Sequence, residues 1–283
     1  MTDLQQLQLA ILKDFVRACE TLGLTYFLVY GSALGAVRHG GFIPWDDDVD
    51  VALPREDYEI FCEKAQRLLP KDLFLQNHRT DKYFPLGFSK LRNSATTFIE
   101  KSCDNLNIHH GVYIDVFPLD GYPEDKRLQK KVEREKRRYD LSRLCCLHVP
   151  LNNRTRLLVF VQRLLGLHRR PDKLVSRLER HVAYPARGAA VWCNHGIWQG
   201  GLEYADRAQY GEGAWASFEG LRVRIPEKID EYLTQNYGDW RTFPPEEKRE
   251  GHHYYRVCDL STPYKDVITV ISDRTVAIKE EYR

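Results

Sequence analysis

Four aspartates within five consecutive positions are the side chains of this sequence best suited to chemistry. The chain reads PWDDDVDVALP, in which Asp48 closes the run of three aspartates and Asp50 follows one valine later. From Asp48 onward polar and apolar residues alternate, which predicts a strand over 48–53 with Asp48 and Asp50 on one face, about 7 Å apart. Two such carboxylates repel each other, and burying them requires a compensating charge. Because oxygen ligands of this kind suit magnesium or manganese, the pair predicts a divalent metal site.

A further carboxylate lies inside the apolar segment GVYIDVFPLDG, residues 111–121. Strand alternation places the two valines and the isoleucine on one face and Asp115 on the other. A carboxylate in the middle of so apolar a strand needs a partner. Asp120 follows a proline, and this position predicts a turn-forming residue.

The segment before the aspartates predicts an anion site. A short apolar strand over 26–30 is interrupted by Gly31 and Ser32, and residues 33–38 have helical composition. A strand that turns into a helix directs backbone N–H groups and the positive end of the helix dipole at one point, which suits a phosphate. The guanidinium of Arg38 could add two charge-assisted hydrogen bonds to the same anion.

Two cations lie on a predicted strand further along. Short strands are expected near 73–76, 86–91 and 96–99, and Lys90 and Arg92 alternate with apolar neighbours, so they share a face. Two readings stay open at this point. The pair is either a set of solvated cations on an edge strand or part of the active site.

The rest of the scaffold is predicted from periodicity and from helix-ending residues. Apolar residues at helical spacing predict an amphipathic helix over 3–22 that packs on the sheet, and a second helix over 55–69. Near the C-terminus a strand over 221–225 and a helix over 227–237 are expected. His252 has no metal-ligand spacing. It is either a functional residue, as a base or a ligand to phosphate, or a surface histidine in a loop.

Composition indicates a soluble globular chain. The 283 residues are 43% hydrophobic with a mean hydropathy of −0.50, enough for one large domain or two small ones. We expect neither a transmembrane helix nor a secretory signal. The seven cysteines form no C-x-x-C pair, and we predict free thiols in a reducing cytoplasm.

Charge is concentrated in the middle of the chain. Residues 126–187 hold 18 Lys and Arg against 5 Asp and Glu, which is +13, whereas the remainder holds 24 against 35, which is −11. This imbalance suggests an anionic partner such as nucleic acid, anionic lipid or a phosphorylated glycan. Helices are predicted over about 124–143, 153–167 and 172–182. The second is very apolar and surrounded by arginines, and it is either a core helix or a helix lying on an anionic membrane.

The segment 184–210 is rich in glycine and aromatic residues, among them Trp192, His195, Trp198 and Tyr204. It is predicted to form loops and short strands. Its rings would suit a sugar face or a quaternary ammonium group in a substrate cleft, and core packing explains them equally well.

The order of strand, Gly-Ser, short helix and Asp-x-Asp strand resembles the polymerase-beta type of nucleotidyltransferase fold. The fuller string over 31–61, GSALGAVRHGGFIPWDDDVDVALPREDYEIF, resembles the signature of the LicD family, which also includes the fukutin-related proteins. The stretches KLRNSATTF, from residue 90, and YGDWRTFPPEEKR, from residue 237, are also similar to that family. The basic middle of the chain is the least similar part.

The resemblance implies an α/β fold with a mixed sheet flanked by helices. It implies a single catalytic domain over 1–283 with a basic helical insertion over 122–185. It also implies site residues with distinct roles: Asp48, Asp50 and Asp115 bind one or two Mg²⁺ or Mn²⁺ ions; Gly31, Ser32 and Arg38 hold the donor diphosphate; Lys90 or Arg92 offsets the charge of the transferred phosphate.

The activity implied by the resemblance is phosphoalcohol transfer, with phosphocholine passing from CDP-choline to a sugar hydroxyl of a lipopolysaccharide, teichoic acid or similar glycan and CMP released. Two alternatives remain: a nucleotidyltransferase that releases pyrophosphate, and a non-catalytic nucleotide-binding scaffold. The expected partners are a CDP-linked donor and a glycan or lipid-linked glycan acceptor, without nucleic acid. The expected location is cytoplasmic, with peripheral contact at the inner face of an anionic membrane left open.

Overall fold

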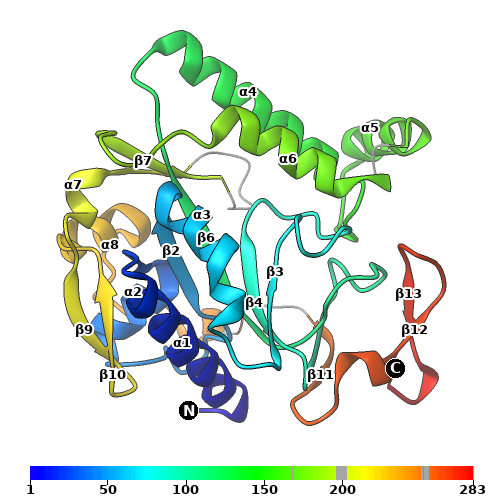
Figure 1. Ribbon diagram of the computed structural model, residues 1–283, viewed down its shortest axis with the longest axis horizontal. Helices are drawn as coiled ribbons and strands as arrows, with labels where there is room; N and C mark the ends of the chain where they lie inside the picture. Colours follow the sequence, from blue (N-terminus) through cyan, green and yellow to red (C-terminus); the bar gives the residue numbers. More distant parts are fainter. Residues whose placement is uncertain (167–168, 196–202, 250, 252–254, 283) are drawn as a thin grey trace.

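The computed structural model describes residues 1–283 except 167–168, 196–202, 250, 252–254 and 283. The predicted role of His252 and the predicted cleft position of Trp198 therefore lie outside the described residues, as does the expected end of a helix at residue 167. The described chain is a mixed α/β structure with a curled sheet and helices packed on it (Figure 1).

The main sheet is mixed, as predicted. Its strand order is β1-β2-β6-β4-β3, and of these neighbours only β2 and β6 run parallel. The end of β6 continues into antiparallel pairs with β7 and then β8. The bounds are β1 Phe27–Leu28, β2 Asp50–Pro54, β3 Leu73–Gln76, β4 Ser89–Asn93, β6 Tyr113–Gly121, β7 Val191–Asn194 and β8 Glu203–Asp206.

Two helices cover one face of this sheet. Helix α1 (Asp3–Leu22) ends at Gly23, which has a φ of 67° and lacks the Cβ that would strain this left-handed conformation. The expected amphipathic helix is therefore confirmed. Helix α3 (Arg55–Lys64), continued by a short 3-10 turn, packs beside α1, with the rings of Phe15 and Phe61 5.1 Å apart.

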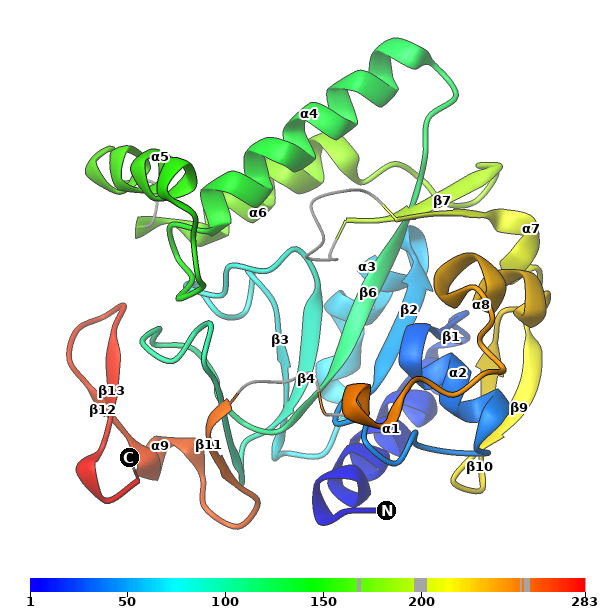
Figure 2. The same ribbon diagram turned by 180° about the vertical axis from the view of Figure 1, so that it is seen from behind.

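The edge at β1 is covered by two C-terminal elements and a short helix. Helix α2 (Tyr30–Arg38) lies beside α8 (Ile229–Tyr237) and the hairpin β9–β10, Ala214–Phe218 and Leu221–Ile225 (Figure 2). A four-residue helix, α7 (Arg207–Tyr210), precedes the hairpin. The predicted strand over 221–225 is confirmed, and α8 begins two residues later than expected.

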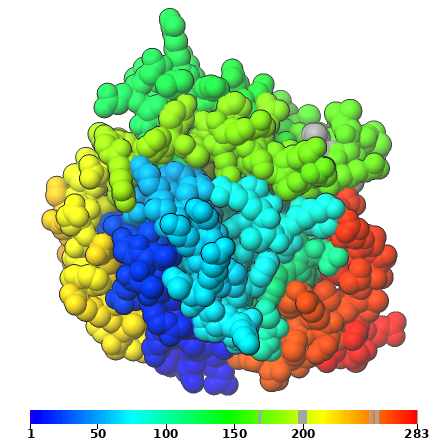
Figure 3. Space-filling model, in the orientation of Figure 1, coloured from blue at the N-terminus to red at the C-terminus, as the bar shows by residue number. Residues whose placement is uncertain are grey.

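The basic middle of the chain forms three helices, as predicted. Helix α4 (Lys126–Arg143) packs along α6 (Pro171–Val182), and α5 (Asn153–Leu164) lies at their end. In the space-filling view these residues form the upper edge of the molecule (Figure 3). No helix among the described residues is long and apolar enough to cross a bilayer.

The C-terminal segment adds small pairs of strands. Strand β11 (Tyr255–Asp259) pairs with β5 (Thr97–Glu100), and α9 (Tyr264–Val267) leads to the hairpin of β12 (Ile268–Val270) and β13 (Val276–Ile278). No disulfide joins any of the seven cysteines, all of which lie in the described part of the chain, so the prediction of free thiols is confirmed.

The prediction of a turn at Asp120 is wrong. Asp120 lies in β6, fully buried, with both carboxylate oxygens bound by the Arg55 guanidinium at 2.5 and 2.8 Å. His195 Nδ1 lies 2.7 Å from the same carboxylate. The strand continues through its proline because an ion pair from α3, far away in the sequence, stabilises the buried charge.

Candidate active site

Asp50 and Asp115 lie side by side at the start of the two parallel strands. They are register partners in the β2–β6 ladder, and both side chains are buried. Adjacent strands are about 4.8 Å apart, so register partners on one face bring their side chains close together. The expected position of Asp115, on a strand beside the Asp-x-Asp strand, is confirmed.

Asp48 lies just outside the sheet. The predicted strand over 48–53 begins two residues later, at Asp50. The reason is in α1, where Gln5 Nε2 donates to the Asp46 carbonyl at 2.8 Å and Gln8 Nε2 donates to the Asp47 carbonyl at 2.7 Å. These side chains hold the aspartate run in an irregular conformation, so Asp48 approaches Asp50 from the preceding loop and not along a strand.

The carboxylates repel one another in this arrangement. Burial raises the pKa of Asp50 well above its usual range, and the charges of Asp48, Asp115 and Asp46 raise it further. The ammonium of Lys90 acts in the opposite direction. The ionised form of Asp50 is therefore unfavourable unless a cation lies close to it, and this environment favours binding of a cation.

Asp46 belongs to this cluster, although the alternation pattern did not single it out. A methyl group placed on Gly31 would meet Asp46 Oδ2 at 2.7 Å, so this carboxylate lies against the first turn of α2 in space that a larger residue at position 31 would occupy. The run of three aspartates was the available signal. The alternation pattern does not include Asp46, because the strand that it predicts begins only at Asp48.

Lys90 neutralises part of the cluster. Its Nζ lies 3.0 Å from Asp115 Oδ1 and 3.2 Å from Glu100 Oε1, and 3.3 Å from the centre of the Tyr113 ring. Lys90 is buried and is the register partner of Asp115 across β4 and β6. The reading of this residue as a solvated cation on an edge strand is wrong.

Arg92 shares the face of Lys90, as predicted, but its guanidinium is held by protein groups. It donates to the Gly111 carbonyl at 2.8 Å, to Glu100 Oε2 at 2.7 Å and to Gln76 Oε1. Arg92 is fully buried. It therefore fixes Glu100, which in turn bonds Lys90, and Lys90 contacts Asp115.

Gly31 and Ser32 lie inside the first turn of α2, because this helix begins at Tyr30, three residues earlier than predicted. Ser32 Oγ accepts the backbone N–H of Asp50 at 2.8 Å. The start of the helix is thus tied to the start of β2, and the anion already beside this turn is the Asp46 carboxylate, which the helix dipole stabilises.

Arg38 does not lie at the helix start. It is the last residue of α2, seven residues beyond Gly31, which corresponds to about 10 Å along the axis. Its Nη1 donates to the Trp240 carbonyl at 2.8 Å, and its guanidinium lies 4.7 Å from the centre of the Phe243 ring. In this conformation the Arg38 guanidinium contacts the C-terminal segment and not the start of the helix.

The C-terminal segment after α8 packs against the aspartate run. The rings of Trp45 and Phe243 are 6.3 Å apart, and the Arg249 guanidinium lies 5.4 Å from the centre of the Trp45 ring. A methyl group on Gly251 would meet Asp47 Oδ2 at 2.9 Å. Two stretches singled out in the sequence, PWDDD and YGDWRTFPPEEKR, therefore pack against each other.

A further carboxylate, Glu203 on β8, lies among tyrosines next to the cluster. Burial raises its pKa to about 6, and a hydrogen bond from Tyr30 acts against that shift. The Tyr30 hydroxyl accepts from Asn194 Nδ2 at 2.9 Å. Burial raises the pKa of Tyr237, and the charges of Asp50, Asp46, Asp48 and Glu203 raise it further, which places Tyr237 near both acidic groups. The aromatic-rich segment 184–210 was the sequence signal for this region.

The donor chemistry fits a divalent metal ion. Carboxylate oxygens from Asp50 and Asp115 are adjacent, and those of Asp48 and Asp46 are close enough to affect the pKa of Asp50. Among the described residues no three His, Cys, Asp or Glu side chains are gathered tightly enough to hold an ion as they stand. Mutual repulsion separates such groups, and Lys90 supplies the positive charge in this conformation.

The part of the chain that carries these residues is similar to known proteins. Residues 23–152 match the family described as LicD/FKTN/FKRP, nucleotidyltransferase domain, and this range includes Asp48, Asp50, Lys90 and Asp115. The chain is 28% identical over 266 residues to the lipopolysaccharide cholinephosphotransferase LicD of Haemophilus influenzae, covering 87% of this chain and 92% of that protein.

Two further proteins are similar over shorter parts of the chain. The ribitol 5-phosphate transferase FKRP of Mus musculus is 52% identical over 42 residues, which is 15% of this chain and 8% of that protein. An uncharacterised protein of Rickettsia prowazekii, RP689, is 30% identical over 119 residues, or 40% of this chain and 39% of that protein. Residues 23–152 therefore match the LicD family domain, and the similarity of the chain to these transferases supports a phosphotransferase.

Proposed function

We propose that this protein transfers phosphocholine from CDP-choline to a sugar hydroxyl of a lipopolysaccharide-type glycan and releases CMP. The observation that carries the proposal is the buried register pair Asp50 and Asp115, bonded to Lys90, within a chain similar over most of its length to a lipopolysaccharide cholinephosphotransferase. We further infer a sheet of the nucleotidyltransferase type, which the adjacent acidic strands and the neighbouring helix α2 support.

Asp48, Asp50 and Asp115 would hold one or two Mg²⁺ or Mn²⁺ ions, and Asp46 is a fourth available carboxylate. Such an ion supplies positive charge that stabilises the transferred phosphate. Ser32 fixes Asp50 through the backbone N–H of that residue, and Arg92 fixes Glu100, so both act as positioning residues. The Lys90 ammonium bonds Asp115 in this structure, and with the donor bound it would instead donate a hydrogen bond to an oxygen of the transferred phosphate.

The reaction is in-line displacement at the β-phosphate of the donor. The acceptor hydroxyl oxygen forms a bond to that phosphorus, the bond to the bridging oxygen breaks, and CMP departs with the electron pair. The hydroxyl proton passes to a carboxylate, Asp115 or Asp48. Attack at the α-phosphate would instead leave cytidylate on the acceptor, so the nucleotide product distinguishes the two reactions.

Incubation with CDP-choline, a divalent metal and a lipopolysaccharide acceptor should yield CMP, measured by nucleotide chromatography. Chelation should stop the reaction, and omission of the acceptor should slow it greatly. Mass spectrometry of the acceptor should show added phosphocholine. Added cytidylate, or pyrophosphate released from CTP, would overturn the proposal in favour of a nucleotidyltransferase. Absence of any turnover with every CDP-alcohol would favour a binding scaffold.

Glu203 is the proposed partner of the donor's cationic end. A carboxylate beside Tyr30 and Tyr237 is chemistry suited to a quaternary ammonium group, because aromatic faces and a negative charge both attract it. Glu203→Gln should raise KM for CDP-choline about tenfold, as expected for loss of ~1–2 kcal/mol, and should leave KM for uncharged CDP-ribitol unchanged.

The matched control is Glu231→Gln, because Glu231 is an exposed residue of α8. It should change neither constant. Equal effects of Glu203→Gln on both donors would show that Glu203 supports the fold and does not select the alcohol.

A further inference from the structure

Helix α5 exposes nearly all of its apolar side chains. Of its 12 residues only Val159 is buried. The large apolar side chains of this helix and of the residue after it are 45% to 72% exposed: Leu157, Leu158, Phe160, Val161, Leu164 and Leu165. The reading of this segment as a core helix is therefore wrong, because its apolar face is directed away from the protein.

Helix α5 is nevertheless capped at its N-terminus and hydrogen-bonded to the rest of the protein. The side chain of Asn152 caps its N-terminus by accepting the Thr155 N–H at 2.9 Å. Arg163 Nε donates to the Cys145 carbonyl at 3.1 Å, and the Cys145 thiol donates to Gln162 Oε1 at 2.9 Å. These bonds fix one side of α5 to the end of α4 and leave the apolar side presented outward.

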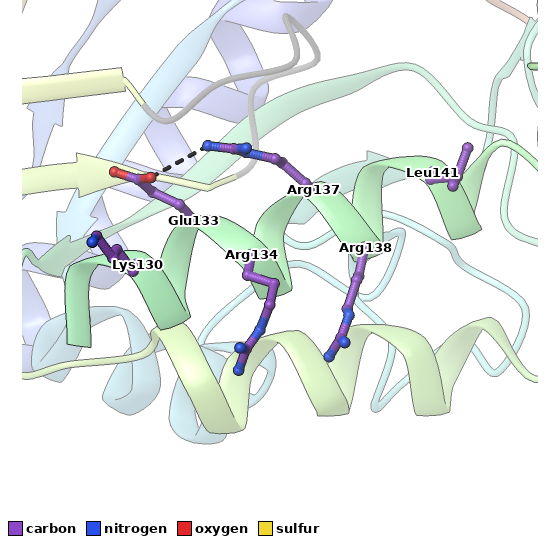
Figure 4. Close-up of a pocket in the computed structure, with 6 residues that line it drawn as sticks. All are labelled: Lys130, Glu133, Arg134, Arg137, Arg138 and Leu141. Atoms are coloured by element: carbon purple, nitrogen blue, oxygen red, sulfur yellow. Dashed lines mark hydrogen bonds and ion pairs between the residues drawn. The ribbon is translucent and has the colours of Figure 1, made fainter. Parts of the chain in front are cut away.

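Basic residues surround the apolar face. Arg154, Arg156, Arg163 and Arg169 are all exposed. The neighbouring helix α4 adds a basic surface, in which Arg134 and Arg138 extend toward α6 and Arg137 pairs with Glu133 at 3.3 Å (Figure 4). Figures 1 and 3 show α4, α5 and α6 along one edge of the molecule. Apolar and cationic groups thus occupy the same edge.

We propose that α5 docks this edge on an anionic lipid bilayer, with its leucines and Phe160 at the boundary of the acyl chains and the surrounding arginines at the headgroup phosphates. An interfacial helix has this combination of a broad apolar face and basic flanks. Its 12 residues span about 18 Å, too short to cross a bilayer core, so the helix lies in the plane of the surface.

Charge favours a bilayer over a second copy of the chain. The segment 126–187 carries 18 basic and 5 acidic residues, and two-fold pairing through this edge would bring the same excess of positive charge together. Anionic headgroups neutralise that charge. The inference does not depend on the proposed transfer reaction, because it concerns a surface and is tested without substrate.

Vesicle flotation tests the proposal. The wild-type protein should float with vesicles containing phosphatidylglycerol, float much less with vesicles of phosphatidylcholine alone, and lose binding as salt rises. Leu157→Ser/Phe160→Ser/Leu164→Ser should reduce binding at least about tenfold, because three apolar side chains no longer enter the membrane. Arg154→Gln/Arg156→Gln should reduce binding to anionic vesicles about tenfold and weaken the salt dependence, which the remaining basic residues of the segment retain in part.

Val270→Ser/Ile271→Ser is the matched control, since these apolar side chains are 61% and 65% exposed on and just after β12, outside the basic segment. This variant should float like wild type. Thermal melting of each variant should match wild type, which shows that the fold is retained. Equal flotation with neutral and anionic vesicles would overturn the proposal. So would a stable dimer, seen by sedimentation, that the α5 variant dissociates.

Discussion

Asp50→Asn should lower turnover about 10³-fold or more, because several kcal/mol of charge stabilisation at the phosphate are lost with the carboxylate. Asp115→Asn should have an effect of similar size, since the two residues are register partners. Steady-state release of CMP measures both. Asp14→Asn, a change in a surface carboxylate that pairs with Arg17, is the control and should be neutral. Normal turnover by both active-site variants would place the chemistry elsewhere.

Asp50→Asn should not reduce the stability of the fold. In the folded protein burial and neighbouring carboxylates raise the pKa of Asp50, so its ionised form is less favourable than in the unfolded chain. Wild-type stability from this group is therefore greatest below the unfolded pKa of about 3.9 and falls as pH rises toward the folded pKa. Asparagine does not titrate. With a chelator present, the Tm of Asp50→Asn relative to wild type should increase from pH 4 to pH 7.

Asp120→Asn should reduce the free energy of unfolding by about 3–5 kcal/mol, since the buried Arg55 guanidinium loses the carboxylate that accepts two of its hydrogen bonds and keeps only Glu59 at 3.0 Å and Glu179 at 3.9 Å. Burial alone would raise the pKa of Asp120, but the charges of Arg55 and His195 and their hydrogen bonds hold it below its usual range. The stabilisation is thus present above the unfolded pKa of about 3.9 and is lost as pH falls through the folded pKa.

Denaturant unfolding with wild type as reference checks this prediction. Replacing both charges, as Arg55→Met/Asp120→Leu, should cost less than Asp120→Asn alone, because no buried charge is left unpaired. Asp14→Asn at the exposed pair with Arg17 should change stability by less than about 1 kcal/mol. A loss as small for Asp120→Asn would show that Arg55 is solvated in the variant.

Local structure was largely predictable because its signals are local. The helix over 3–22 follows from apolar residues at helical spacing and a glycine at its end, and both appear as expected. Lys90 and Arg92 share a face because alternation along a strand fixes this. The resemblance, and the need of a buried carboxylate for a partner, predict Asp115 on a strand beside Asp50, and the β2–β6 ladder confirms this position.

Predictions from the sequence differ from the structure where side chains from distant parts of the chain form the deciding contacts. The aspartate run stays out of the sheet before Asp50 because Gln5 and Gln8 of α1 bond its carbonyls. Arg38 points to Trp240 and Phe243, some 200 positions away in the chain, and a helical pattern contains no information on that contact.

The sequence by itself determined the element types, the acidic strands and the basic helical middle, because each depends on periodicity or composition within a short window. The tertiary structure alone decided the approach of Asp46 to Gly31, the burial of Asp120 against Arg55, and the outward direction of the apolar face of α5. An amphipathic pattern predicts that one face of a helix is apolar. It does not predict what covers that face. Only packing between segments far apart in the chain settles whether such a face meets protein or remains exposed.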